Sequence, residues 1–264
     1  TGLNRLIVCH AGGRMLIGSA DVKILGERSP RIASFASEPL MLSDVACLQL
    51  TAEMRNSARE AVLPPALHPT IPPVVSIQVW DVADSPVGAF GFAMCRVSCR
   101  SGVRARGFST AAVASTQAAA QILTERFGFP CVLGEVTLRR HYDGVDAEVM
   151  VDGSRTLGIA ALDPEPMDLD DVQYTGNLNL AHTPLGLRLA QVEVDHVASR
   201  VERLSARLSA FDGEAWGNRL LDPYFVVSAS VALETVSIQP IRFVCKPDEL
   251  AFTGTESVAA AGKT

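Results

Sequence analysis

The sequence predicts an α+β domain in which antiparallel β-sheet dominates. About ten short runs alternate apolar and polar residues between turn signals, whereas only two or three segments have helical spacing. Strands and helices are mixed irregularly, as in domains built around one antiparallel sheet. No internal repeat and no clean linker interrupts the 264 residues, so we expect a single domain over 1–264.

The first part of the chain predicts an N-terminal hairpin or extension over 1–45. Two apolar runs, Leu6–Cys9 and Met15–Ile17, flank the pair Gly12-Gly13, and glycine suits the tight turn of a hairpin. The body of the domain is then expected over 46–250. Residues 251–264 are small and polar and predict a flexible tail.

A short helix and a proline-rich connector are predicted next. Thr51–Val62 has the spacing of an amphipathic helix, and Pro64-Pro65 would end it. From Leu63 to Pro73, five of eleven residues are proline. Because proline cannot donate a backbone hydrogen bond, this tract predicts an extended connector.

Alternating runs then predict the strands of the sheet. Strands are expected at Val74–Val82, Gly88–Val97, Gly107–Val113, Val132–Arg139, Ala147–Val151, Thr156–Leu162, Asn177–Leu180, Leu187–Val194 and Phe225–Leu233. Asp143-Gly144 indicates a hairpin turn, and Asp163–Asp171 indicates a solvated acidic loop. Residues 196–211 fit a helix as well as a strand.

One helix has signals at both of its ends. Residues 115–127 have apolar side chains at helical spacing, with Ser115 or Thr116 as the N-cap. Gly128 follows the last turn, where a left-handed residue commonly ends a helix. Pro130 stops any continuation.

Composition narrows the function classes. The net charge of −6 argues against nucleic acid or an anionic membrane as the main partner. The six cysteines form no CxxC pair, and no apolar run reaches the length of a membrane span, so we expect reduced thiols in a cytoplasmic protein. The sequence has no HExxH, P-loop or GxGxxG motif, so we expect no metal and no nucleotide or redox cofactor.

Four features occur in a definite order between Cys47 and Val244. A short predicted helix runs into Leu63–Leu67, a strand ends at Trp80–Asp84, the helix 115–127 leads directly into Gly128-Phe129-Pro130, and a late strand covers Phe225–Leu233. This order resembles the acetoacetate decarboxylase family, and Thr124–Pro130 is its most specific part. The resemblance implies a closed antiparallel β-barrel or cone over 46–250, with a few short helices, an apolar cavity and a homo-oligomeric assembly.

The chain departs from the family at the positions that carry its chemistry. In the family a Schiff-base lysine follows the proline and a second lysine lowers its pKa, but here these positions are Cys131 and Val132. The resemblance aligns one family glutamate near Gln78, a second near Phe90, and a late-strand Tyr or His with Ser230. Only Lys23, Lys246 and Lys263 are lysines, and by pattern Lys23 and Lys246 do not point to the pocket. Imine chemistry is therefore not expected.

Three residues are candidate catalytic groups. Cys131 would be a thiol nucleophile, or a small buried side chain in place of lysine. Glu125 would be a general acid or base, or a solvated residue of the helix. Gln78 would donate hydrogen bonds in the pocket, or face solvent. Glu193 and Asp195 should share one strand face, with His196 on the opposite one.

Five further residues are candidate contacts for a substrate: Arg126, Phe90, Phe129, Trp80 and Ser230. Arg126 would bind a carboxylate, or extend along the apolar helix face. The composition, rich in alanine, arginine and valine, is also typical of bacterial proteins from high-GC genomes, where relatives of this kind often act in secondary metabolism.

The leading hypothesis is a cofactor-independent lyase, cyclase or isomerase that acts on an apolar or polyketide-like carbonyl compound. A non-catalytic protein that binds a small molecule or stabilises a partner is the alternative. A decarboxylase with a relocated lysine is the third reading. An enzyme should line its cavity with at least one titratable group whose pKa is perturbed.

Overall fold

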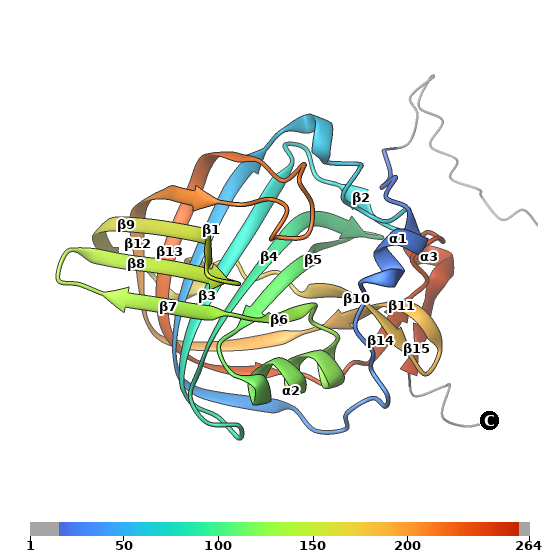
Figure 1. Ribbon diagram of the computed structural model, residues 1–264, viewed down its shortest axis with the longest axis horizontal. Coiled ribbons are helices and arrows are strands. Elements are labelled where there is room, and N and C mark those ends of the chain that lie inside the picture. Colours follow the sequence, from blue (N-terminus) through green and yellow to red (C-terminus); the bar gives the residue numbers. More distant parts are fainter. Residues whose placement is uncertain (1–15, 259–264) are drawn as a thin grey trace, which may run out of the picture.

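A computed structural model describes residues 16–258 of the chain (Figure 1). The strands are β1 Leu40–Met54, β2 His68–Pro69, β3 Val74–Asp84, β4 Phe90–Ser101, β5 Arg104–Ala114, β6 Cys131–Leu133, β7 Glu135–Arg140, β8 Gly144–Val151, β9 Ser154–Pro166, β10 Asn177–Thr183, β11 Gly186–Val192, β12 Val194–Phe211, β13 Pro223–Ile238, β14 Phe243–Cys245 and β15 Thr255–Ser257. The helices are α1 Val22–Glu27, α2 Gln117–Phe127 and α3 Ala251–Gly254, with 3-10 turns η1 Asn56–Ala58 and η2 Leu169–Asp171.

All strands join one mainly antiparallel sheet, whose hydrogen-bonded path is open. It runs β15-β14-β11-β10-β5-β4-β3-β1-β13-β12-β9-β8-β7, and β2 and β6 pair with β4 and β5 off this path. The predicted α+β class with dominant sheet is confirmed, but the described sheet does not close into the expected hydrogen-bonded barrel. The curled sheet instead brings β7 against β3, β4 and β5 without a ladder between them.

The strands from β11 to β12 form a cone, and the direct chain connection between β11 and β12 closes it. β11 and β12 lie far apart along the hydrogen-bonded path, yet only Glu193 separates them in sequence. The eight strands from β11 to β12 must therefore curve until these two meet, because consecutive residues are only ~3.8 Å apart. The cone encloses one face of the sheet, which we call the cone face.

The cone face and the opposite face carry separate cores because alternate residues of a strand point to opposite sides. On the cone face, Cys47, Trp80 and Phe92 lie side by side in register on β1, β3 and β4. On the opposite face, Leu48 and Val79 occupy neighbouring register positions and belong to a larger apolar core. The buried polar residues described below lie on the cone face.

The helix predicted at 115–127 is confirmed as α2, together with both of its ends. The Thr116 side chain accepts a hydrogen bond from the Ala119 backbone N–H, and Gly128 adopts a left-handed conformation with φ of 69°. A Cβ at Gly128 would approach the Cβ of Ala181 to 2.9 Å, so the turn is also closely packed. The nine predicted strands are present, with a break at Gly134 between β6 and β7.

One predicted helix is wrong, one ambiguous segment is a strand, and the predicted hairpin lies outside the described residues. Residues 251–257, expected as part of a flexible tail, form α3 and β15. The helix predicted over Thr51–Val62 is wrong, because β1 continues to Met54 and pairs with both β3 and β13. Residues 196–211 are strand β12, which pairs with β9 and β13. The hairpin predicted around Gly12-Gly13 falls within residues 1–15, outside the described range.

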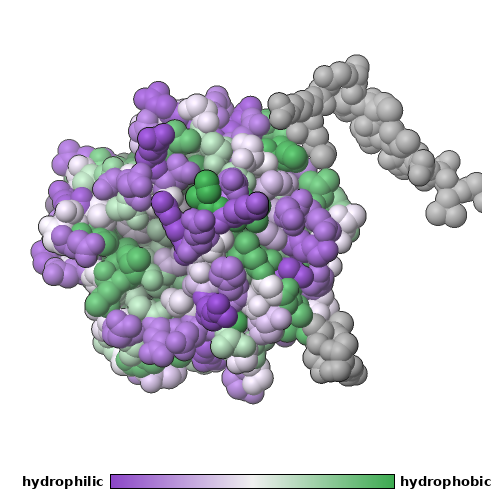
Figure 2. Space-filling view, turned by 45° about the vertical axis from the view of Figure 1, so that its right-hand side comes forward, coloured by the Kyte–Doolittle hydropathy of each residue, from purple (hydrophilic) through white to green (hydrophobic). Residues whose placement is uncertain are grey.

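The surface mixes polar residues with smaller apolar patches. Figure 2 shows hydrophilic and hydrophobic side chains interleaved over the face turned to the reader. In residues 16–258, no helix is both long and apolar enough to cross a membrane.

Candidate functional site

A buried carboxylate lies at the centre of the cone face. Glu234 of β13 has a fully buried side chain, and it accepts hydrogen bonds from the Tyr174 hydroxyl and from His196 Nδ1, each at 2.9 Å. His196 comes from β12 and its side chain is only 6% exposed. The rings of Tyr174 and His196 stack at 3.6 Å between centroids. We call Glu234, His196 and Tyr174 the acid–base cluster.

Burial and the charge of Glu234 keep the two neighbouring groups Tyr174 and Cys47 protonated. Burial, followed by the nearby Cys47 thiol and the Glu234 carboxylate, raises the pKa of Tyr174 above its usual value. Burial and then Glu234 also raise the pKa of Cys47 well above the ordinary thiol value. Tyr174 and Cys47 therefore remain neutral around the carboxylate at physiological pH and can donate protons in hydrogen bonds to it.

Amide groups and one indole extend the polar surface. Gln78 donates to the Gln49 side-chain oxygen at 2.6 Å from the neighbouring strand. The Trp80 indole packs edge-on against His196, and its buried Nε1–H has no hydrogen-bond partner among the described residues. A buried donor without a partner is costly, and its retention points to a role other than stability.

Arg96 is a buried cation without a carboxylate partner in the described part of the chain. Its guanidinium donates to three neutral oxygens: the Thr175 backbone carbonyl at 2.9 Å, Asn177 Oδ1 at 2.9 Å and Ser76 Oγ at 3.1 Å. Its Nε has no partner. Burial lowers the pKa of Arg96 to about 10, which still leaves it charged at neutral pH.

One short segment, Gln173–Gly176, covers these groups. Gln49 donates to the Gln173 carbonyl at 3.0 Å, and Arg96 donates to the Thr175 carbonyl. Between these anchors, the Tyr174 side chain reaches inward to Glu234. The segment precedes β10 and follows the acidic 3-10 turn η2. Tyr174 and its neighbours in the segment also line an open cleft on the outer side, so Tyr174 borders both the buried cluster and this cleft.

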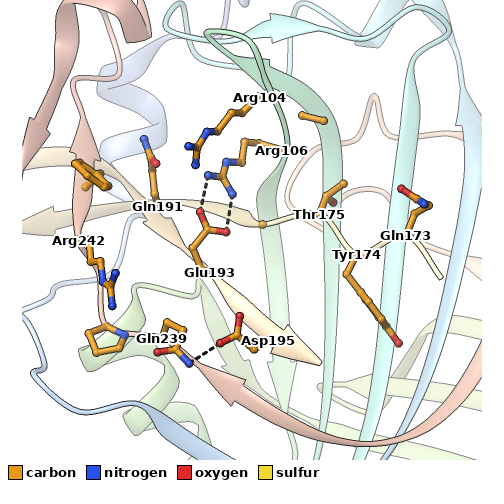
Figure 3. A pocket seen from close by; sticks show the side chains of 14 residues that line it. Arg104, Arg106, Gln173, Tyr174, Thr175, Gln191, Glu193, Asp195, Gln239 and Arg242 are labelled. Carbon is orange, nitrogen blue, oxygen red and sulfur yellow. Dashed lines mark hydrogen bonds and ion pairs between the residues drawn. The ribbon is translucent and has the colours of Figure 1, made fainter. Parts of the chain in front are cut away.

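This outer cleft has a volume of about 790 Å³ and is shown in Figure 3. It is bounded by the start of β5, the segment Gln173–Gly176, the junction of β11 and β12, and the connection from β13 to β14. Arg106 forms a two-pronged ion pair with Glu193 at 2.8 and 2.5 Å. This pairing lowers the pKa of Glu193.

Three residues around the start of β12 point to the sides of the strand that the sequence predicted. Glu193 and Asp195 both line the outer cleft, whereas His196 lies on the cone face beside Glu234. A one-residue step along the strand thus separates the cleft from the acid–base cluster.

Five of the sequence-predicted site residues share the cone face. Gln78 and Trp80 are two residues apart on β3 and therefore point to the same side. Phe90 pairs with Val82, the next residue on that side, and Ser230 pairs with Gln49. Phe129 is fully buried and packs against Phe92 on the same face. Gln78 is buried rather than facing solvent, and its side-chain amide donates a hydrogen bond to Gln49.

Cys131 also packs against the cone-face core, but it does not contact the acid–base cluster. Burial raises its pKa to about 12, and a hydrogen bond with Thr124 opposes this shift. A thiolate is therefore strongly disfavoured at neutral pH, and this favours the interpretation of Cys131 as a small buried side chain.

Glu125 and Arg126 lie on α2, away from the polar residues. Glu125 is exposed and accepts a hydrogen bond from Gln121 one turn earlier at 3.0 Å. Arg126 donates to the Glu38 backbone carbonyl and lies over the Phe127 ring. Neither side chain is brought to the buried cluster or to the outer cleft.

The lysines of the described chain are also remote from these groups. Lys23 is exposed on α1. Lys246 pairs with Glu249 at 2.8 Å, and that hydrogen bond raises the pKa of Lys246. Lys263 lies outside the described residues. Within residues 16–258, no cluster of three or more His, Cys, Asp or Glu side chains is arranged to hold a metal ion.

Sequence reasoning missed the central residues of this site. Glu234 stands between Ala232 and Val236 on one buried strand face, and a carboxylate there is an unusual neighbour for apolar residues. That contrast was the available signal. Tyr174 lies in a loop without periodicity, so only the fold brings it to Glu234.

Comparison with solved structures identifies the fold. The chain superimposes on an acetoacetate decarboxylase with a TM-score of 0.69 at 16% identity, covering 78% of this chain and 89% of the other. The acetoacetate decarboxylase of Legionella pneumophila gives a TM-score of 0.69 at 16% identity, with 87% and 96% covered. MppR, an enduracididine biosynthesis enzyme in complex with pyruvate, gives 0.63 at 19% identity, with 77% and 89% covered.

Sequence comparisons find no such likeness: no protein-family model matches the chain, and no curated protein matches it. The similar solved structures are enzymes, and their identities to this chain are low enough that they establish the architecture alone. This chain therefore has the acetoacetate decarboxylase-like fold, with the acid–base cluster of Glu234, His196 and Tyr174 inside its cone.

Proposed function

We propose that this chain is an enzyme that moves a proton on a small carbonyl compound with its own side chains. The observation that carries the proposal is the fully buried Glu234, whose two carboxylate oxygens accept hydrogen bonds from the Tyr174 hydroxyl and His196 Nδ1. A carboxylate in this environment is a candidate general base, and its two partners are candidate donors.

The proposed reaction begins with enolisation of the substrate. Glu234 takes a proton from the carbon next to the carbonyl, and the electron pair of that C–H bond forms a C=C bond. The electrons of the C=O bond move to oxygen, which accepts a hydrogen bond from Tyr174 or a proton from His196. Return of the proton to another carbon gives isomerisation. Loss of a leaving group or attack on a second carbonyl gives lyase or cyclase chemistry.

The side chains packed around the cluster on the cone face favour a substrate with an apolar part. Trp80, Phe92 and Phe129 pack together beside the cluster, while the Trp80 N–H and the Gln78–Gln49 amides are polar groups within the same face. Substrate reaches Glu234 when Tyr174 leaves its stack on His196. Of the similar structures, MppR is described in complex with pyruvate, which makes a 2-oxo acid a suitable first probe.

Lysine-imine decarboxylation receives no support from the described residues. An imine-forming amine needs a lowered pKa, whereas the ion pair with Glu249 raises the pKa of Lys246. Treatment of the protein with pyruvate and borohydride should therefore leave its mass unchanged. A mass increase that disappears in a Lys246→Ala or Lys23→Ala variant would contradict this part of the proposal.

The proposal is tested by deuterium exchange in heavy water. We expect the wild-type protein to exchange the C3 protons of pyruvate or 2-oxohexanoate faster than buffer, as followed by proton NMR. Glu234→Gln should lower the exchange rate by about 100-fold or more, because it removes the base while keeping the shape of the side chain. His196→Gln should also lower it.

Glu125→Gln is the matched control, because it makes the same chemical change on an exposed helix residue. It should leave exchange unchanged. Equal exchange by Glu234→Gln and wild type would overturn the acid–base assignment.

A non-catalytic binding protein is the second candidate, and the closed polar cluster favours it. Each carboxylate oxygen of Glu234 already has a protein donor. Binding of a 2-oxo acid by the wild-type protein, without any exchange above buffer, would favour this candidate over the enzyme.

A further inference from the structure

The outer cleft differs in chemistry from the buried cluster. Three arginines and two carboxylates line it, so it has an excess of positive charge in a chain whose net charge is −6. Its volume of about 790 Å³ falls within the range of small-molecule sites, roughly 300–1,000 Å³. The pairing of these charges shows which of them are available to a ligand.

The two carboxylates of the cleft already have partners. Both oxygens of Glu193 accept from Arg106, which is itself buried. Asp195 accepts from the Gln239 side-chain amide at 2.8 Å. Neither carboxylate forms an ion pair with the two remaining arginines, Arg104 and Arg242, in the described part of the chain.

Arg104 and Arg242 have no ion pair and no side-chain hydrogen bond within residues 16–258. They come from separate elements: Arg104 opens β5, and Arg242 lies in the connection between β13 and β14. Figure 3 shows both side chains at the same cleft, with the Gln191 amide on the side of Arg104. Two guanidinium groups and an amide are thus available as donors from different sides.

The Arg106–Glu193 pair gives this cleft a fixed wall. A Cβ at Gly176 would approach Arg106 Nη1 to 2.0 Å and Glu193 Oε2 to 2.7 Å, so the ion pair is packed directly against the backbone there. Arg106 is only 5% exposed. Because this pair is already fixed, less side-chain entropy is lost when a ligand binds in the cleft.

We propose that the outer cleft binds a small molecule through its phosphate group, with Arg104 and Arg242 as the two binding residues. A phosphate has three terminal oxygens that can accept from two guanidinium groups at once, and it can carry two negative charges where a carboxylate carries one. Arg104 and Arg242 together carry two positive charges, as many as a phosphate dianion carries negative ones. Its two binding residues differ from the groups proposed for proton transfer at Glu234.

Binding of inorganic pyrophosphate, measured by calorimetry on the full chain, tests the proposal. We expect pyrophosphate to bind more tightly than citrate and acetate, and the affinity to fall as salt increases. Arg104→Ala and Arg242→Ala should each weaken pyrophosphate binding about tenfold or more, because each removes charge-assisted hydrogen bonds.

Arg207→Ala is the matched control, since Arg207 is exposed on β12 and has no ion pair within the described range. It removes the same charge and should leave the affinity unchanged. The proposal fails if pyrophosphate does not bind, if Arg207→Ala weakens it as much as the cleft variants, or if citrate binds more tightly. None of these outcomes bears on deuterium exchange, so the two proposals fail separately.

Discussion

The two faces of the central strands bury different chemistry in the same sheet. On β1, Leu48 and Leu50 point to the apolar face, while Cys47 and Gln49 point to the cone face. The apolar face, which lies opposite the cone face, contributes to stability through the burial of apolar side chains. The cone face also encloses Glu234 and Arg96, whose desolvation costs free energy unless partners compensate it. The difference indicates that the polar groups are retained for a role other than stability.

The largest expected effect on stability comes from the apolar face. Leu50→Ala empties space around a fully buried side chain and should lower the free energy of unfolding by about 2–5 kcal/mol. Urea unfolding measures this loss. Deuterium exchange per folded molecule should stay near the wild-type value. If the fully folded variant lost exchange activity, the claim that the apolar face affects only stability would be contradicted.

A smaller loss is expected from Tyr174→Phe on the cone face. The variant keeps the stacked ring but removes the hydroxyl that donates to Glu234, which should cost about 1.5–3 kcal/mol. Urea unfolding again provides the measurement, with Tyr142→Phe as the control, because Tyr142 is fully exposed. If the two variants are equally stable, the hydrogen bond to Glu234 contributes nothing.

The smallest effect concerns the outer cleft at low pH. Arg106 lowers the pKa of Glu193 below its ordinary value of 4.5, so the ionised pair stabilises the fold above that pH. This contribution is lost as the pH falls through the lowered pKa. Because the Glu193 side chain is 48% exposed, we expect less than about 1 kcal/mol.

Unfolding free energies measured between neutral and acidic pH provide the test. Glu193→Gln should flatten part of the decline below pH 4.5, whereas Glu125→Gln should leave the decline unchanged. An identical pH profile for wild type and Glu193→Gln would show that the pair is fully screened.

Features set by neighbouring residues in sequence were the most predictable. The caps of α2 depend on Thr116 and Gly128 themselves; Gly128 was identified correctly, and Thr116 was one of the two residues proposed for the N-cap. Residues 196–211 satisfy both periodicities, so pairing with β9 and β13 decides the outcome. The predicted helix after Thr51 failed for the same reason: Leu50, Ala52 and Met54 also alternate as in a strand, and two partner strands extend β1.

The site was predictable only in part. Resemblance and alternation together grouped Gln78, Trp80 and Ser230, which do share the cone face. Glu125 was a less informative choice, because proximity in sequence to the Phe-Pro motif does not place its side chain inside the cone. The acid–base cluster joins β12, β13 and a loop, and no local pattern connects residues so far apart in sequence.

The most direct test of the central claim is a crystal structure of the protein with pyruvate. The account predicts pyruvate beside Glu234 and His196, with the Tyr174 ring displaced from its 3.6 Å stack on His196. Pyruvate bound only elsewhere, with Glu234 still bonded to both Tyr174 and His196, would contradict it.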